Sequence, residues 1–203
     1  MQSNNKKEPI KLFLDMDNVL VNTIPVLNQR AKSLPTGARP DRIPGIFRDL
    51  DPTEDAIASV NKLADYYDLY ILTTAPWSNP SAWQDKVAWI QHFFGAEKNS
   101  PFYKKITMTH DKGLVHYVGG ILIDDRPYHG ASSWNDPKTN SVWIQYGFDK
   151  RLTWKDDLVP FLIDIAKNSQ QTSDLKTAVK KSNQNPKYVI HGNVSTFKKE
   201  NWE

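Results

Sequence analysis

Short apolar runs alternate along the chain with longer stretches whose apolar residues recur at helical spacing. The apolar runs fall at residues 10–14, 69–72, 105–109, 120–123 and 142–146. Runs of this length, apolar at most positions, are typical of parallel strands that are covered on both faces. The pattern therefore predicts five strands, with 105–109 and 142–146 carrying the weaker signal.

Helical periodicity appears in three segments between and after these runs, at residues 52–67, 80–94 and 158–165. In the second segment, Trp83, Val87, Ile90 and Phe94 share one stripe, and Gly95 follows as a plausible helix end. Strands that alternate with helices predict an α/β fold built on a doubly wound parallel sheet.

Residues 24–50 interrupt this alternation directly after the first predicted strand. They combine a short helix candidate with a stretch rich in Pro, Gly and Arg. An active-site cover can be inserted at this position of the fold. We therefore expect a core of residues 9–23 and 51–167, with 24–50 as a small cap.

The last segment, residues 168–203, is rich in Ser, Asn, Gln and Lys. Such composition indicates a partly flexible extension, and we expect its first half to be a mobile linker. Residues 188–197 are a candidate hairpin around Gly192.

Composition narrows the class of protein. The 203 residues suit one domain with a small insertion, and the absence of cysteine excludes disulfide scaffolds and thiolate metal sites. No apolar run approaches the roughly 18 residues of a membrane span, and the N-terminus lacks a signal-peptide stretch. We expect a soluble cytoplasmic protein with no membrane partner.

The formal charge of +3 is unevenly distributed. After residue 166 there are seven Lys against three acidic residues, so this tail carries +4 and the remainder carries −1. The body is therefore not a basic platform for nucleic acid, and we do not expect a nucleic-acid partner.

Polar side chains follow four of the predicted strands. They are Asp15 and Asp17, Thr73 and Thr74, Lys112, and Asp124 and Asp125. Ligands of an open α/β sheet bind at the carboxyl ends of its strands, so these groups are expected at one edge. Gathered carboxylates need a counter-charge, and an oxygen-only donor set favours Mg²⁺.

This set is suited to phosphoryl transfer. An aspartate can attack phosphorus, a second carboxylic acid two residues later can protonate the leaving oxygen, and Thr73 and Lys112 can hold phosphoryl oxygens. Each group alone has a plainer explanation: a helix cap, a solvated turn or a surface lysine. Their joint occurrence, each after a predicted strand, favours the functional interpretation.

The motifs resemble those of the haloacid dehalogenase-like (HAD) hydrolase superfamily. The segments DMDNVLV, ILTTAPWSNPSAWQDKVAWI, THDKGLV and LIDDRPYHGA are similar to its 5′(3′)-deoxyribonucleotidase branch, the cytosolic type C 5′-nucleotidases, over about residues 9–150. This resemblance implies a Rossmann-like sheet with a small helical cap after the first strand, and Mg²⁺ as the cofactor.

The resemblance also assigns roles to the acidic residues. Asp15 would be the nucleophile and a metal ligand. Asp17 would be the general acid and base, with its backbone carbonyl on the metal. Asp125 would be a metal ligand, with Asp124 close by or acting through water.

Phosphate and substrate contacts follow from the same resemblance. Thr73, Thr74 and Lys112 would bind the phosphoryl group, and Lys86 matches a lysine of the branch that approaches the phosphate. Phe47 and Arg48 fall where the cap should meet substrate, although Phe47 is equally suited to the core of the cap.

The chain departs from the branch at several positions. Asn18 replaces a usual glycine, Thr23 stands where animal enzymes have an aromatic residue, His110 replaces an arginine, and the cap is shorter. The phosphate chemistry is compatible with these changes, but pyrimidine deoxyribonucleotide specificity does not follow.

The sequence therefore predicts a Mg²⁺-dependent phosphomonoesterase acting through an aspartyl-phosphate, with a nucleoside monophosphate as the favoured substrate. The alternatives are a phosphatase for another small phosphate ester, a phosphotransferase using the same residues, and a catalytically silent domain that binds a partner through its basic tail. The sequence is also compatible with a homodimer.

Overall fold

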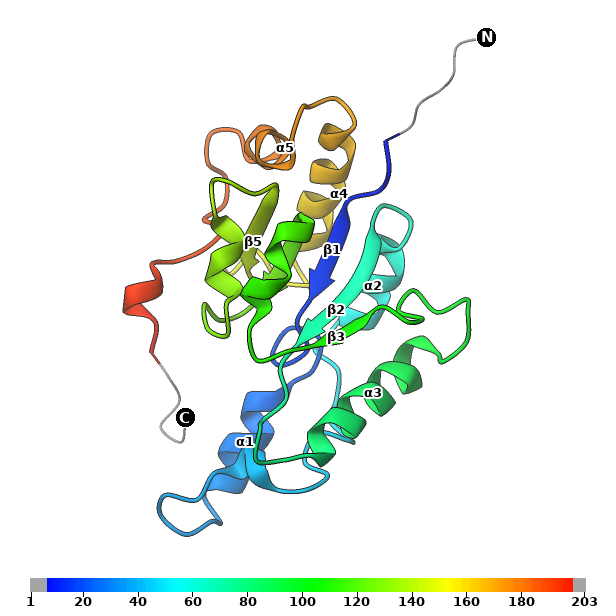
Figure 1. Cartoon of the computed structure of the whole chain (residues 1–203). Coiled ribbons are helices and arrows are strands. Elements are labelled where there is room, and N and C mark those ends of the chain that lie inside the picture. Colours follow the sequence, from blue (N-terminus) through cyan, green and yellow to red (C-terminus); the bar gives the residue numbers. More distant parts are fainter. Residues whose placement is uncertain (1–6, 199–203) are drawn as a thin grey trace.

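The computed structural model describes residues 7–198 (Figure 1). Five parallel strands form a sheet in the order β3-β2-β1-β4-β5. The strands are β1 Lys11–Leu14, β2 Asp68–Thr73, β3 Ile106–Met108, β4 Gly120–Asp124 and β5 Ser141–Gln145. The chain leaves β1 toward β2 and β3 and then returns to β4, so the strand order reverses between β1 and β4. The predicted α/β fold is confirmed.

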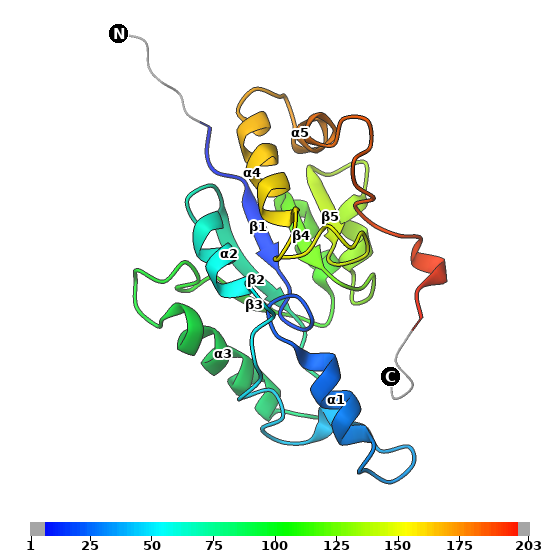
Figure 2. The same cartoon turned by 180° about the vertical axis from the view of Figure 1, so that it is seen from behind.

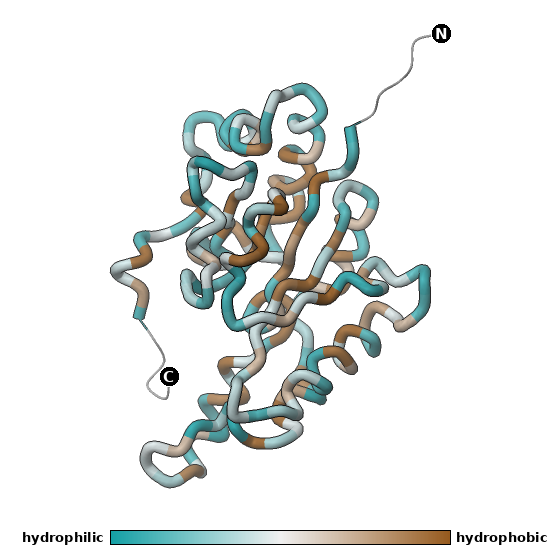
Figure 3. The backbone as a smooth tube through the Cα atoms, viewed as in Figure 1, coloured by the Kyte–Doolittle hydropathy of each residue, from teal (hydrophilic) through white to brown (hydrophobic). Residues whose placement is uncertain are grey.

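The strands form where apolar runs were predicted because both faces of the sheet are covered. Leu12 and Leu14 of β1 are fully buried in the main core, whereas Phe13 packs in a second cluster with Trp134 on the other face. In Figure 3 the apolar colour is concentrated along these central strands.

The α-helices are α1 Thr23–Ala31, α2 Ala56–Leu63, α3 Ser81–Phe94, α4 Leu158–Ser169 and α5 Leu175–Ser182. Short 3₁₀ helices are η1 Pro40–Arg42, η2 Lys112–Leu114, η3 His116–Val118, η4 Ala131–Asn135 and η5 Val194–Thr196. Helices α2 and α4 lie in front of the strands in Figure 2, and η4 packs against the opposite face. Among the described residues, no helix combines the length and apolar character that a bilayer crossing requires.

Helix α2 is shorter than the predicted 52–67 because the preceding residues bind elsewhere. Thr53 donates its backbone N–H to Leu20 O at 2.8 Å, and Pro52 forms a bridge with Val21. Asp55 then adopts a left-handed conformation with φ of 60°, and the helix begins only after it.

The inserted segment 24–50 contains most of α1 and all of η1, and it lies beyond the carboxyl ends of the strands (Figure 1). Polar contacts fasten it to the start of α3. Asn79 Nδ2 donates to Asp41 O at 2.9 Å and to Ile43 O at 3.0 Å, and Gly45 N donates to Ser81 Oγ at 2.9 Å. The insertion thus faces the edge where the predicted site residues gather.

The C-terminal segment differs from the expected linker and hairpin. Helix α5 forms within the expected linker and packs against α4, with Leu175, Ala178 and Val179 buried. These apolar positions share one helical face, which the surrounding lysines and polar residues obscure. Residues 188–197 form one extended pass with the η5 turn at its end, not two paired strands.

Candidate active site

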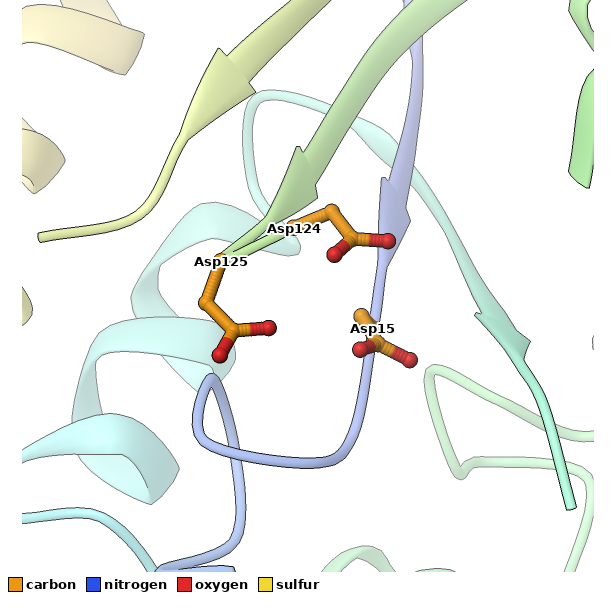
Figure 4. Close-up of side chains that lie close together, drawn as sticks. All are labelled: Asp15, Asp124 and Asp125. Carbon is orange, nitrogen blue, oxygen red and sulfur yellow. The ribbon is translucent and has the colours of Figure 1, made fainter. Parts of the chain in front are cut away.

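Three carboxylates meet at the reversal of strand order. Asp15 follows β1, Asp124 ends β4, and Asp125 comes directly after it (Figure 4). One carboxylate oxygen of each lies within 4.8 Å of those of the other two. The β1–β4 register causes this, because Asp15 N donates to Ile123 O at 2.9 Å and brings the two strand ends level.

Lys112 places a positive charge within this acidic group. Its Nζ lies 2.9 Å from Asp15 Oδ1 and 2.5 Å from Asp124 Oδ2, and the side chain is buried. Its backbone carbonyl accepts a hydrogen bond from Trp134 Nε1 at 3.1 Å, which fixes the start of η2. Burial lowers the pKa of Lys112, but Asp124 and Asp15 outweigh burial and raise it above its usual value.

The three carboxylates differ in how readily they ionise. Burial raises the pKa of Asp15, but Lys112 and Lys86 outweigh it and hold that pKa below its usual value. Burial raises the pKa of Asp124 to about 6 despite the attraction of Lys112. Burial and then the neighbouring Asp124 raise the pKa of Asp125 well above its usual value. The charge of Lys112 therefore offsets the burial of Asp15 but not that of Asp124 and Asp125.

Asp125 has the least satisfied carboxylate. Its Oδ2 accepts a hydrogen bond from Asn18 Nδ2 at 3.1 Å, whereas its Oδ1 is buried with no hydrogen-bond partner, and Arg126 Nε is 3.6 Å away. A buried carboxylate oxygen without a partner is costly. An all-oxygen donor set with a deficit of positive charge fits a hard divalent cation such as Mg²⁺.

Asp17 is held by two side chains at the edge of the acidic group. Its Oδ1 accepts a hydrogen bond from Thr23 Oγ1 at 2.9 Å, and its Oδ2 lies 2.5 Å from Lys86 Nζ. The tight loop after β1, in which Asn18 has a φ of 59°, turns Asp17 toward these partners. Thr23, expected only as a departure from an aromatic residue, therefore orients Asp17.

Hydrogen bonds join Lys86 to Thr73 and Thr74. Lys86 Nζ also donates to Thr73 Oγ1 at 3.1 Å and to Thr74 O at 2.6 Å. Thr73 is fully buried, and Thr74 Oγ1 donates to Thr109 O at 3.0 Å. Of these three residues, Thr74 lines the cavity that opens between the strand ends and the inserted segment. Lys86 therefore binds both the Asp17 carboxylate and the residues at the end of β2.

A cavity of about 350 Å³ opens between the strand ends and the inserted segment. It is lined by Asp15, Asp17, Asn18, Thr74, Lys112 and Asp124 from the core, by Ile24, Leu27, Arg39, Asp41, Arg42 and Phe47 from the insertion, and by Trp77, His110, Arg126, Tyr128 and His129 from the loops. A lining that combines carboxylates, basic side chains and aromatic rings can receive a compact organic anion.

The two cap residues singled out in the sequence take different positions. Phe47 lines the cavity and is buried, with Lys86 Nζ 5.3 Å from its ring centre. Arg48 is outside the lining and pairs with buried Asp85, with Nε 3.1 Å from Oδ1. The cap side chains Arg39 and Asp41, which form an ion pair at 2.9 Å, carried no motif that could have marked them.

The family model for 5′ nucleotidase, deoxy (Pyrimidine), cytosolic type C protein matches residues 41–137. A Vibrio phage KVP40 protein named "Putative 5′(3′)-deoxyribonucleotidase" is 38% identical over 146 residues, covering 70% of this chain and 79% of its own length.

Two cellular relatives match a shorter part of the chain. The human "5′(3′)-deoxyribonucleotidase, cytosolic type" is 31% identical over 85 residues, which covers 41% of this chain and 39% of its own length. A protein of Staphylococcus aureus strain Mu50 is 42% identical over 88 residues, covering 42% of this chain and 44% of its own length. These matches span less than half of either cellular relative.

Proposed function

Because this chain belongs to the 5′(3′)-deoxyribonucleotidase family of HAD-like hydrolases, we propose that it is a Mg²⁺-dependent phosphomonoesterase acting through an aspartyl-phosphate. The observation that carries the proposal is the convergence of Asp15, Asp17, Lys112 and Asp124 on one cavity. Asp15 and Asp17 follow β1, Lys112 begins η2 and Asp124 ends β4, and a purely structural role would not require all four to meet.

Asp15 is the proposed nucleophile. The nearby lysines keep its pKa low, so its carboxylate is ionised at neutral pH. Its oxygen attacks phosphorus, the bond between phosphorus and the ester oxygen breaks, and Asp17 gives its proton to the leaving oxygen. Lys112, which touches Asp15, lies close enough to offset negative charge on the transferring group.

Hydrolysis of the aspartyl-phosphate completes the cycle. Asp17, now a carboxylate, takes a proton from water as the water oxygen attacks phosphorus. The phosphorus–Asp15 bond breaks and inorganic phosphate leaves. Thr23 and Lys86 hold Asp17 in one orientation for both proton transfers.

The metal has a defined set of donors in this proposal. Asp15, Asp125 and Asp124 would hold Mg²⁺, with the backbone carbonyl of Asp17 added by the family resemblance. When bound, Mg²⁺ supplies positive charge that offsets the phosphoryl oxygens and lowers repulsion among the carboxylates.

A nucleoside monophosphate is the proposed substrate. The names of the relatives support this class, and the cap supplies Phe47, Arg39 and Arg42 to the lining of the cavity. Trp77 is 84% exposed at the cavity and its ring lies 5.7 Å from that of His110, so aromatic surface is available to a base. The cytosolic name of the human relative supports a cytoplasmic location.

The proposal is tested by phosphate release from 5′- and 3′-(deoxy)nucleoside monophosphates, sugar phosphates and p-nitrophenyl phosphate, with Mg²⁺ and with EDTA. We expect Mg²⁺-dependent release, highest with nucleotides, and a loss of at least about 10³-fold in Asp15→Asn. If the protein is folded and Mg²⁺ is present, release of phosphate from none of these esters would contradict the proposal. Addition of alcohol acceptors separates hydrolysis from phosphotransfer.

A further inference from the structure

The C-terminal segment runs beside the end of β5 and contacts its last residue, Gln145 (Figure 1, red). Gln145 is buried, with 6% of its surface exposed. Its backbone N–H donates to Ile190 O at 2.7 Å, and its side-chain Oε1 accepts from Gly192 N at 2.9 Å. Two hydrogen bonds therefore join one residue of β5 to residues that lie more than forty positions later in the chain.

The other end of the Gln145 side chain reaches the acidic group. Its Nε2 donates to the backbone carbonyl of Asp125 at 2.9 Å. A backbone N–H can only donate and a carbonyl can only accept, so the contacts with Gly192 and Asp125 leave one orientation for the amide. Without Gly192, only the Asp125 carbonyl would hold the side-chain amide in place.

The neighbouring carbonyl is held from β5 as well. Asp124 O accepts from Tyr146 N at 3.1 Å and from Trp143 Nε1 at 3.0 Å. His191 stacks on Trp143, with ring centres 5.5 Å apart and planes 15° from parallel. The same stretch of the C-terminal segment thus contacts both β5 side chains, Trp143 and Gln145, that bind the backbone of Asp124 and Asp125.

The segment is anchored before it reaches Gln145. Tyr188 is buried and donates its hydroxyl to Asp157 Oδ2 at 3.0 Å, and Val189 N donates to Asp149 Oδ2 at 3.1 Å. These contacts hold the chain in place immediately before Ile190. The segment is a fixed part of the fold at this point and not a loose extension.

We propose that residues 188–192 form a strap that positions Asp125 through Gln145, which makes Gln145 a positioning residue for the metal site. This inference rests on the metal site of the proposed function. Asp125 comes directly after β4, and its carboxylate accepts a hydrogen bond from Asn18 Nδ2 and lies 3.6 Å from Arg126 Nε. The hydrogen bond from Gln145 Nε2 constrains its backbone carbonyl.

Two variants test the strap from its two ends. Gln145→Met keeps the length of the side chain and removes both amide contacts. A chain ending at Val189 retains the Tyr188 anchor and removes Ile190 and Gly192. In both, we expect Mg²⁺ affinity measured by calorimetry to fall about 10- to 100-fold, as for other partners of metal ligands. Combining the two changes should weaken binding no further than either change alone.

Kinetics add a second readout. The Mg²⁺ concentration for half-maximal phosphate release should rise by the same factor, while the nucleotide KM at saturating Mg²⁺ stays within about 2-fold of wild type. Val194→Ala, an exposed change beyond the strap, is the matched control and should bind Mg²⁺ as wild type does.

The outcomes separate this inference from the proposed function. If wild type binds Mg²⁺ and Gln145→Met binds it equally well, the positioning role is overturned, whatever happens to the melting temperature. If wild type binds no Mg²⁺, the metal site itself fails and the strap's role fails with it. Mg²⁺ binding without ester hydrolysis would overturn the phosphomonoesterase proposal only, because the calorimetric comparison does not need turnover.

Discussion

Lys86 Nζ lies 2.5 Å from Asp17 Oδ2, an ion pair between α3 and the loop after β1. Only 1% of Lys86 is exposed, whereas 17% of the Asp17 side chain is. The lysine therefore approaches Asp17 from the protein interior and leaves its outer side facing the cavity. The same Nζ holds the end of β2 through Thr73 and Thr74, so α3, β1 and β2 together fix the proposed general acid.

Lys86→Met should lower kcat about 10²-fold with KM changed less than 3-fold, because Asp17 loses the contact that orients it. Steady-state kinetics with a nucleotide measure this, and Lys62→Met on the exposed side of α2 is the control. A variant with normal kcat and a strongly raised KM would instead make Lys86 a phosphate-binding residue, as the sequence predicted. Thermal unfolding checks that the variant is folded.

Asp17→Asn should affect poor leaving groups more than good ones. A nucleoside alkoxide needs a proton from Asp17 as it leaves, so turnover should fall about 10²- to 10⁴-fold. The p-nitrophenolate group leaves without a proton, and slow hydrolysis of the aspartyl-phosphate should then give a burst of one p-nitrophenolate per site. Rapid mixing measures the burst. Equal losses with both substrates and no burst would contradict the assigned role.

Arg48→Met should reduce stability without changing substrate affinity. The change leaves the buried Asp85 carboxylate without its cation, and Arg48 is half exposed, so we expect a loss of about 1–2 kcal/mol. Denaturant unfolding measures this loss, with Arg30→Met on α1 as the control. The nucleotide KM should stay within 2-fold in Arg48→Met and rise in Phe47→Leu, because only Phe47 lines the cavity. A large KM effect in Arg48→Met would indicate substrate contact.

Mg²⁺ should stabilise the protein more at pH 7 than at pH 5. Burial raises the pKa of Asp124 to about 6, so the metal-free native state binds more protons than the unfolded state between about pH 4 and 6. The contribution of this group to the free energy of unfolding therefore decreases as pH rises through that window. Mg²⁺ binds the ionised carboxylates and should restore the stability that the metal-free protein loses as pH rises.

Melting temperatures with Mg²⁺ and with EDTA at both pH values measure the effect. Asp124→Asn should abolish most of the difference between the two pH values. An equal shift of melting temperature by Mg²⁺ at pH 5 and pH 7 in the wild-type protein would contradict the prediction.

Leu175→Ala should destabilise the whole protein by about 2–5 kcal/mol, because Leu175 is buried where α5 packs on α4. Lys180→Ala on the exposed side of α5 should have almost no effect. Chemical denaturation of the two variants measures the difference. A solvated tail would give the same stability for both, and that result would contradict the packed helix.

The sheet and the position of the acidic residues were predictable from the sequence alone. Continuous apolar runs mark strands buried on both faces, and parallel strands bring the residues after them to one edge. In the register of β1 with β4, Leu14 is paired with Ile123, so the residues that follow them, Asp15 and Asp124, lie side by side. These features depend on local periodicity and on one topological rule, so short stretches of sequence carry them.

The partners of those residues were decided only by the tertiary structure. Lys86 is 69 positions from Asp17, Arg48 is 37 from Asp85, and Gln145 is 47 from Gly192. No periodicity links residues so far apart, because their contacts depend on how α3, the insertion and the C-terminal segment pack. Helix α5 was not predicted from the sequence for a related reason. Its three buried residues contribute stability only when they pack against α4. The sequence by itself thus determined which groups gather at the sheet edge, and the packing of distant segments decided which of them orient one another.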